Sequence, residues 1–184
     1  MKEALLLIDI QRDYFPGGRM EVVDSELATQ MAQNLLLSFR EKGKTIIHIQ
    51  HISTRKEATF FLPETEGITI HESVLPETGE TVITKHFPNS FRDTGLEDQL
   101  KKHEIKKIFF CGMMSHMCID ATVRAAFDLG FECIVAEDAC ATKDLSFKGV
   151  EVPSAQVHAA YMAALGAVYA TIMQSNEIIE QMNT

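Results

Sequence analysis

The 184-residue chain has no tryptophan, only four cysteines, no cluster of basic residues and no long apolar run. The cysteines show no paired CxxC spacing, so we expect reduced thiols and neither a zinc knot nor a disulfide framework. Seventeen Lys and Arg residues stand against 26 Asp and Glu, a formal net charge of -9, which makes nucleic acid and anionic membranes poor partners.

Membrane and export segments are also missing from the sequence. No stretch approaches the roughly 18 apolar residues of a membrane span. The apolar stretch near the N-terminus is stopped by Asp9 and is too short for the core of a signal peptide, so we expect a cytoplasmic protein. An apolar content of 46% and a charged content of 23% are ordinary for a globular protein. We therefore predict one domain over residues 1–184.

Short apolar runs alternate along the chain with segments of helical periodicity. The expected strands are 5–10, 45–52, 81–84, 105–111, 132–136 and 168–173, and the expected helices are 24–42, 94–103, 117–129, 154–167 and 176–182. Because the strands are apolar without alternation, they favour a parallel sheet that is covered on both faces. We predict an α/β fold, a doubly wound (Rossmann-like) domain with a six-stranded, mainly parallel sheet and helices on both faces. Residues 53–79 read as a long loop, which in compact domains is usually functional.

Cys118 is the strongest candidate for a catalytic residue. It stands in the first turn of an expected helix, just past the carboxyl end of an expected strand. Unpaired backbone N–H groups and the positive end of the helix dipole favour an anion there, so we expect its thiol to ionise more easily than a core thiol. Open α/β sheets bind their ligands outside the carboxyl ends of their strands. Cys118 is therefore a candidate nucleophile.

Two charged residues interrupt other apolar strand ends. Asp9 ends the first strand and Lys85 the third. Neighbouring parallel strands lie about 4.8 Å apart, so their ends can bring such side chains together. An ammonium stabilises a thiolate, and a carboxylate can take the thiol proton and return it to a leaving group. The backbone N–H groups near Met114 and Cys118 would then form an oxyanion hole.

Several segments resemble the isochorismatase-like cysteine hydrolase superfamily over nearly the whole chain. They are Asp9-Ile-Gln-Arg-Asp-Tyr-Phe, Lys85 with Phe87, Ser90 and Phe91, Thr94-Gly-Leu, Gly112-Met-Met-Ser-His-Met-Cys118 with Thr122, Arg124 and Ala125, and Glu137-Asp-Ala-Cys-Ala-Thr142. The resemblance implies a catalytic triad of Asp9, Lys85 and Cys118. It also implies a non-proline cis peptide between Met113 and Met114, in the loop that forms the oxyanion hole.

The resemblance also bears on chemistry and cofactors. Isochorismate-cleaving members characteristically lack the cysteine, so its presence favours hydrolysis of an amide, imide or carbamate through a thioester-type intermediate. Nicotinamidase members hold a metal with an Asp-x-His pair and a further histidine. Here the second strand reads His48-Ile-Gln-His51-Ile-Ser without that Asp, and the next histidine is His71. We therefore expect no cofactor and no metal, while a nicotinamidase-type, metal-assisted amidase stays an alternative.

The sequence does not name the substrate beyond a small amide-like molecule and water. Side chains near the strand ends are candidates to line an apolar pocket: Phe15, Phe60, Phe61, Phe87, Phe91 and His116. The resemblance implies a homo-oligomer, a homodimer or homotetramer, and the helix from Ser154 carries a surface of small apolar residues that would allow close helix packing.

Two other classes of protein remain open from the residues alone. Acids and a lysine at strand ends are also found in phosphoacceptor receiver modules, but the second strand ends without the acceptor Asp and Cys118 would have no role. A redox or binding protein could use the thiol without turnover, although no second cysteine forms a CxxC with Cys118.

Overall fold

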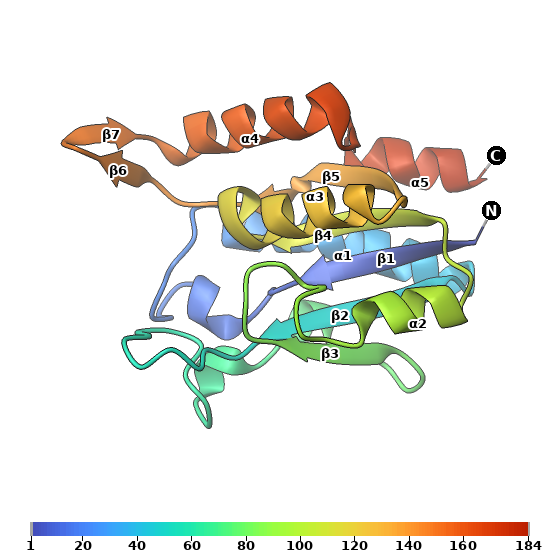
Figure 1. The fold of residues 1–184 in the computed structure, drawn as a ribbon, viewed down its shortest axis with the longest axis horizontal. Coiled ribbons are helices and arrows are strands. Elements are labelled where there is room, and N and C mark those ends of the chain that lie inside the picture. Colours follow the sequence, from blue (N-terminus) through green and yellow to red (C-terminus); the bar gives the residue numbers. More distant parts are fainter. Residues whose placement is uncertain (1, 184) are drawn as a thin grey trace.

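The computed structural model describes residues 2–183 and is built on one parallel six-stranded sheet, in the order β3-β2-β1-β4-β5-β8 (Figure 1). The strands are β1 (Glu3–Ile8), β2 (Thr45–His51), β3 (Thr81–Lys85), β4 (Lys107–Met113), β5 (Glu132–Ala141) and β8 (Thr171–Met173). The helices are α1 (Ser25–Glu41), α2 (Leu96–Lys102), α3 (Asp120–Asp128), α4 (Ser154–Val168) and α5 (Ser175–Asn183). The predicted fold class is confirmed.

Helices cover both faces of the sheet, as its apolar strands require. In β1, Leu5 and Leu7 point to a core shared with α1 and α5, while Leu6 and Ile8 point to a core shared with α2, α3 and α4. This alternation follows from the two-residue period of a strand. All of these side chains are buried, so β1 is central and apolar on both faces.

The strand order reverses beside β1, the first strand of the chain. From β1 the chain moves outward through β2 and β3, then crosses to β4 on the other side and continues to β5 and β8. In such sheets the crevice at this reversal, outside the carboxyl ends of the strands, is where ligands bind. The ends of β1 and β4 border that crevice.

Gly112 allows β4 to approach β1 closely at this point. Its φ is +123°, and a Cβ placed on it would lie 2.0 Å from the carbonyl oxygen of Ile8. Only glycine, which has no Cβ, can occupy this position. The β4–β5 register also shifts between Phe110 and Gly112. The chain therefore leaves β4 beside the end of β1, where Asp9 follows.

The structure differs from the sequence predictions in several boundaries and one motif. β5 continues to Ala141 instead of ending at 136, and Cys118 lies in a π-helical turn, Ser115–Ile119, that precedes α3. A two-stranded antiparallel hairpin, β6 (Leu145–Phe147) and β7 (Val150–Val152), was not predicted, because three-residue strands carry little periodicity. Residues 53–79 form a loop with two short 3₁₀ turns. No helix within residues 2–183 is long and apolar enough to cross a membrane.

Candidate active site

Four neighbouring strands each supply one polar group to the same edge of the sheet. Lys85 is the last residue of β3, His51 is the last of β2, Asp9 follows β1, and Cys118 lies in the turn after β4. The sequence analysis expected three of these to meet, and the structure brings them together. Asp9 has a φ of +53°, a left-handed conformation that Asp and Asn tolerate better than most residues.

The Lys85 ammonium is the centre of this arrangement. Its Nζ lies 2.7 Å from Asp9 Oδ2 and donates a hydrogen bond of 3.1 Å to Cys118 Sγ. It lies 2.9 Å from His51 Nδ1 and also donates to the carbonyl oxygen of Phe87 at 3.1 Å. Lys85 and Asp9 are both fully buried. A buried ion pair of this kind is stable only with such additional hydrogen bonds.

The Cys118 thiol is less acidic than the sequence analysis expected. Burial raises the pKa of Cys118 above that of a free thiol, and the Asp9 carboxylate raises it further, while Lys85 acts in the opposite direction. The expectation from the helix terminus was therefore wrong for the resting site, because it ignored the cost of charging a sulfur that is 4% exposed. The Cys118 sulfur lies beside the Asp9 carboxylate, a group that can accept a thiol proton.

The surroundings favour a protonated Lys85 next to a neutral His51. Burial acts to lower the pKa of Lys85, but the Asp9 carboxylate and the Cys118 sulfur more than offset this, and the pKa is raised. Burial lowers the pKa of His51 to about 4. A neutral His51 accepts a proton of the ammonium at Nδ1 and carries its own proton on Nε2.

Gln11 fixes the end of the strand that carries His51. Its side chain accepts a hydrogen bond from the His51 backbone N–H at 2.7 Å and donates to the carbonyl oxygens of His51 and Ile68 at 2.9 Å each. Gln11 is fully buried, so its amide replaces solvent for three backbone groups. The sequence analysis did not single out Gln11; its only signal was a polar amide two residues after Asp9.

A cavity of about 120 Å³ has Cys118 in its wall. Its walls are Tyr14, His51, Ser53, Arg55, Phe60, His86, Phe87, Pro88, Met114, Met117 and Cys118. Two of the six predicted pocket residues, Phe60 and Phe87, are among them. Cys118 and Met114 were predicted as nucleophile and oxyanion-hole residue, whereas the walls from loops such as Ser53, Arg55 and Pro88 were not, because those loops have no periodicity.

The remaining predicted pocket residues lie elsewhere, packed against other side chains. Phe61 lies behind the wall, with its ring centroid 5.6 Å from that of His51. Phe15 stacks on His71 at 3.9 Å, and Phe91 packs against Phe131 at 6.2 Å. The His116 ring Nδ1 lies 2.5 Å from Thr142 Oγ1. None of the four is in the cavity wall.

The peptide bond between Met113 and Met114 is cis, as the resemblance implied. Met113 is buried in the core, whereas Met114 is in the cavity wall. The carbonyl oxygen of Met114 accepts hydrogen bonds from the N–H groups of Met117 and Ile119, at 3.0 and 3.3 Å. These bonds hold the turn that carries Cys118.

Comparisons with known proteins agree with this geometry. The model of the isochorismatase domain matches residues 3–177. An uncharacterized isochorismatase family protein of Bacillus subtilis, YddQ, is 51% identical over 180 residues, which cover 98% of this chain and 100% of YddQ.

The chain belongs to the isochorismatase family. The crystal structure of a protein from Oleispira antarctica, described as an isochorismatase hydrolase, superposes with a TM-score of 0.94 at 50% identity and covers 97% of this chain and 96% of that one. The nicotinamidase of Escherichia coli is 26% identical over 213 residues, with 95% of this chain and 97% of that protein covered. This family of hydrolases includes amidases, and the chain is a hydrolase of this family. The receiver-module hypothesis is therefore wrong.

A metal such as nicotinamidase relatives use does not fit these residues. Asp9, His51 and Cys118 offer donor atoms within 4.8 Å of one another, but the Lys85 ammonium contacts all three. A divalent ion would need these atoms at about 2.0–2.3 Å, beside a positive charge. His48 and His71 lie apart from this group: His48 Nε2 is 2.9 Å from Glu80 Oε2, and His71 Nδ1 accepts from Ser73 N–H.

Proposed function

We propose that this hydrolase cleaves a C–N bond of a small amide, imide or carbamate through a thioester-type intermediate on Cys118. The observation that carries the proposal is the position of Lys85 Nζ, 2.7 Å from Asp9 Oδ2 and 3.1 Å from Cys118 Sγ, beside a cavity that Cys118 lines. A nucleophile, a proton acceptor and a fixed cation meet there, and these are the groups that acyl transfer needs.

Acylation begins when the thiol attacks the carbonyl carbon of the substrate. The S–H bond breaks and its proton passes to the Asp9 carboxylate, while the S–C bond forms and the carbonyl electron pair moves to oxygen. The N–H groups of Met114 and Cys118 are our proposed donors to that oxyanion. Lys85 stabilises the negative charge on sulfur as it develops, which offsets the raised pKa of the resting thiol.

Collapse of the tetrahedral intermediate breaks the C–N bond. The leaving nitrogen takes the proton from Asp9 and departs as ammonia or an amine, and the acyl group stays on sulfur. Water then adds to the thioester carbonyl and gives a proton to Asp9. When the C–S bond breaks, the thiolate recovers this proton and the acid is released.

The cavity restricts the substrate to a small molecule. Its volume of about 120 Å³ is smaller than the 300–1,000 Å³ that is typical of sites for drug-sized ligands. The rings of Phe60 and Phe87 supply apolar walls, and His51 Nε2–H is the ring's remaining donor. We propose that this N–H orients a polar atom of the substrate. No metal and no cofactor takes part in these steps.

A screen of small primary amides, cyclic imides and carbamates for release of ammonia or amine tests the proposal. Turnover by the wild type and none by Cys118→Ala is the expected result. Cys133→Ala is the matched control, since Cys133 is equally buried but lies on β5 with its thiol near the carbonyl oxygen of Val123 in α3. Hydrolysis at the wild-type rate by Cys118→Ala would refute the proposal. We further propose that the protein is a homodimer or homotetramer that binds neither nucleic acid nor membranes.

A further inference from the structure

The unpredicted hairpin of β6 and β7 is well formed but has an uncovered apolar face. Lys148 and Gly149 form its two-residue turn with φ values of +51° and +81°, the combination of a type I′ turn, which matches the twist of paired strands. Phe147 lies opposite Val150, and Leu145 lies opposite Val152. These four side chains share one face of the ribbon, because every second residue of a strand does.

Solvent reaches the outer pair on this face. The side chains are 71% exposed at Phe147 and 62% exposed at Val150. Figure 1 shows the hairpin projecting beyond the start of α4, away from the sheet. A two-stranded hairpin alone is only marginally stable in water, and an exposed aromatic–aliphatic pair at its tip is typical of a contact surface.

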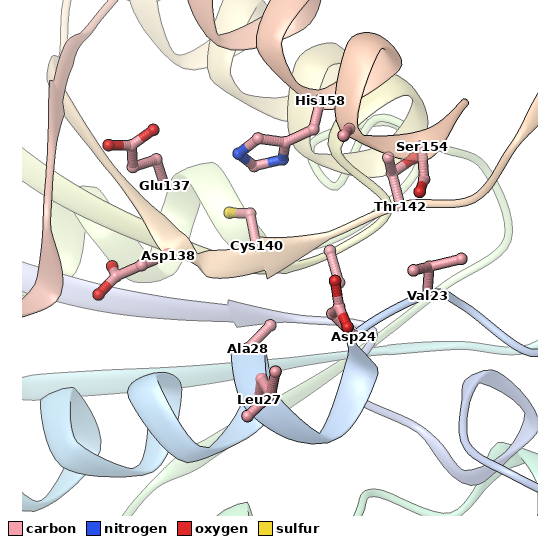
Figure 2. Close-up of a pocket in the computed structure, with 12 residues that line it drawn as sticks. Val23, Asp24, Leu27, Ala28, Glu137, Asp138, Cys140, Thr142, Ser154 and His158 are labelled. Atoms are coloured by element: carbon pink, nitrogen blue, oxygen red, sulfur yellow. The ribbon is translucent and has the colours of Figure 1, made fainter. Parts of the chain in front are cut away.

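A pocket of about 380 Å³ lies between the start of α1, the end of β5 and the first turn of α4 (Figure 2). Its apolar walls include Val23, Leu27 and Ala155. The acidic residues Asp24, Glu137 and Asp138 also line it. The Asp138 carboxylate accepts hydrogen bonds from Ser175, and that of Glu137 accepts one from Gln174. The pocket is separate from the cavity at Cys118, with which it shares no lining residue.

The hairpin tip and this pocket match in size and in charge. A cavity of roughly 150 Å³ already accepts a benzene ring, so the pocket has room for the ring of Phe147. The Lys148 ammonium lies 5.4 Å from the centroid of that ring and would bring a positive charge to a pocket lined by three acidic residues. The hairpin does not cover the pocket of its own chain, since Phe147 stays exposed.

We infer that the Phe147–Val150 tip of one copy of the chain inserts into the Val23–Leu27–Ala155 pocket of a second copy. Twofold symmetry makes the contact reciprocal, so each dimer contains it twice. The second copy is the occupant because this chain itself carries the apolar tip, the cation and the acidic pocket that match. The inference rests on the proposed homo-oligomer and is independent of the proposed reaction.

Light scattering after size-exclusion chromatography, together with directed disulfide formation, tests the contact. The wild type is expected to be a dimer, and Phe147→Ser to raise its dissociation constant at least about tenfold, as loss of a central aromatic contact does. Leu75→Ser is the matched control, since Leu75 is an exposed apolar residue on the loop before β3. Glu137→Lys and Lys148→Glu should each weaken the dimer, and their combination should restore part of it.

Mixing Phe147→Cys with Leu27→Cys should give a disulfide between the two chains, whereas mixing Phe147→Cys with Leu75→Cys should not. The native cysteines are buried and give little background. A monomeric wild type would overturn both the contact and the homo-oligomer, and would leave the reaction untouched. A dimer that survives Phe147→Ser and forms no 147–27 disulfide would overturn the contact alone.

Discussion

The Lys85 ammonium lies 2.7 Å from Asp9 Oδ2 at a point where both side chains are fully shielded from solvent. Asp9 directly follows β1, and Lys85 is the last residue of β3. Each charge is tolerated there because of the other. Lys85 also donates a hydrogen bond to Cys118 Sγ. Stability and reactivity at this site are therefore coupled.

Lys85→Met should destabilise the protein by about 3–5 kcal/mol, because it leaves the Asp9 carboxylate buried without a counter-charge. Combining it with Asp9→Asn should recover part of that loss, since no buried charge then remains. Urea unfolding of the wild type, the single variants and the double variant measures both effects. Asn is the suitable replacement because the backbone at Asp9 is left-handed. A double variant less stable than Lys85→Met would contradict this account.

The rate of Cys118 alkylation by iodoacetamide should still increase with pH above about 8.5–9.5, where the rate for an ordinary thiol reaches its plateau. The reason is that burial and the Asp9 carboxylate raise the pKa of Cys118. Asp9→Asn should increase the rate at pH 8 by removing a nearby negative charge, and Lys85→Met should decrease it. Peptide mapping resolves Cys118 from Cys111, Cys133 and Cys140. A plateau in the wild-type rate below pH 8 would show that the thiol is already ionised.

His51 should make the folded protein less stable as the pH falls. Its pKa is about 4 in the folded protein and 6.5 in a free side chain, so the unfolded chain binds the proton more readily between those values. Above pH 6.5 both states are neutral and His51 has no effect. Between pH 7 and pH 4 the wild type should lose about 3 kcal/mol more of its free energy of unfolding than His51→Gln does. Equal losses in the two proteins would contradict the neutral state of His51.

Gln11→Leu should destabilise the protein by about 3 kcal/mol, since it takes the side-chain partner from the His51 N–H and carbonyl and one of two donors from the Ile68 carbonyl. Gln50→Ala is the control: Gln50 donates one hydrogen bond, to the carbonyl of Ile68, and is only partly buried, so its loss should cost less than about 1 kcal/mol. Thermal unfolding of both variants gives the comparison. Similar midpoints would mean that Gln11 does not hold the end of β2.

The order of apolar runs along the chain was enough to predict the sheet and the residues that meet at its edge. Asp9 and Lys85 interrupt apolar strands, and Cys118 follows one, so the parallel arrangement brings them together without knowledge of any loop. His51 ends a strand in the same way. Its contact with Lys85 was not predicted because a histidine at a strand end has no single expected role.

The cavity walls and the acidity of Cys118 could not be read in the same way. Phe60 and Phe87 line the cavity while Phe15 and Phe91 do not, and the loop conformations that decide this leave no periodic signal. Burial also reverses the effect of a helix terminus on a thiol, and burial of a single atom depends on the packed structure. The hairpin of β6 and β7 was missed because its strands have only three residues each.

The most direct test of the reaction is the mass of the protein during turnover of an amide found in the screen. Rapid quenching followed by intact-mass measurement and peptide mapping should show one acyl group, attached to Cys118, in the wild type. The Cys118→Ala variant should show none, and Cys133→Ala should show the same adduct as the wild type. Hydrolysis with no adduct at any time, or with the acyl group on another residue, would contradict covalent catalysis by Cys118.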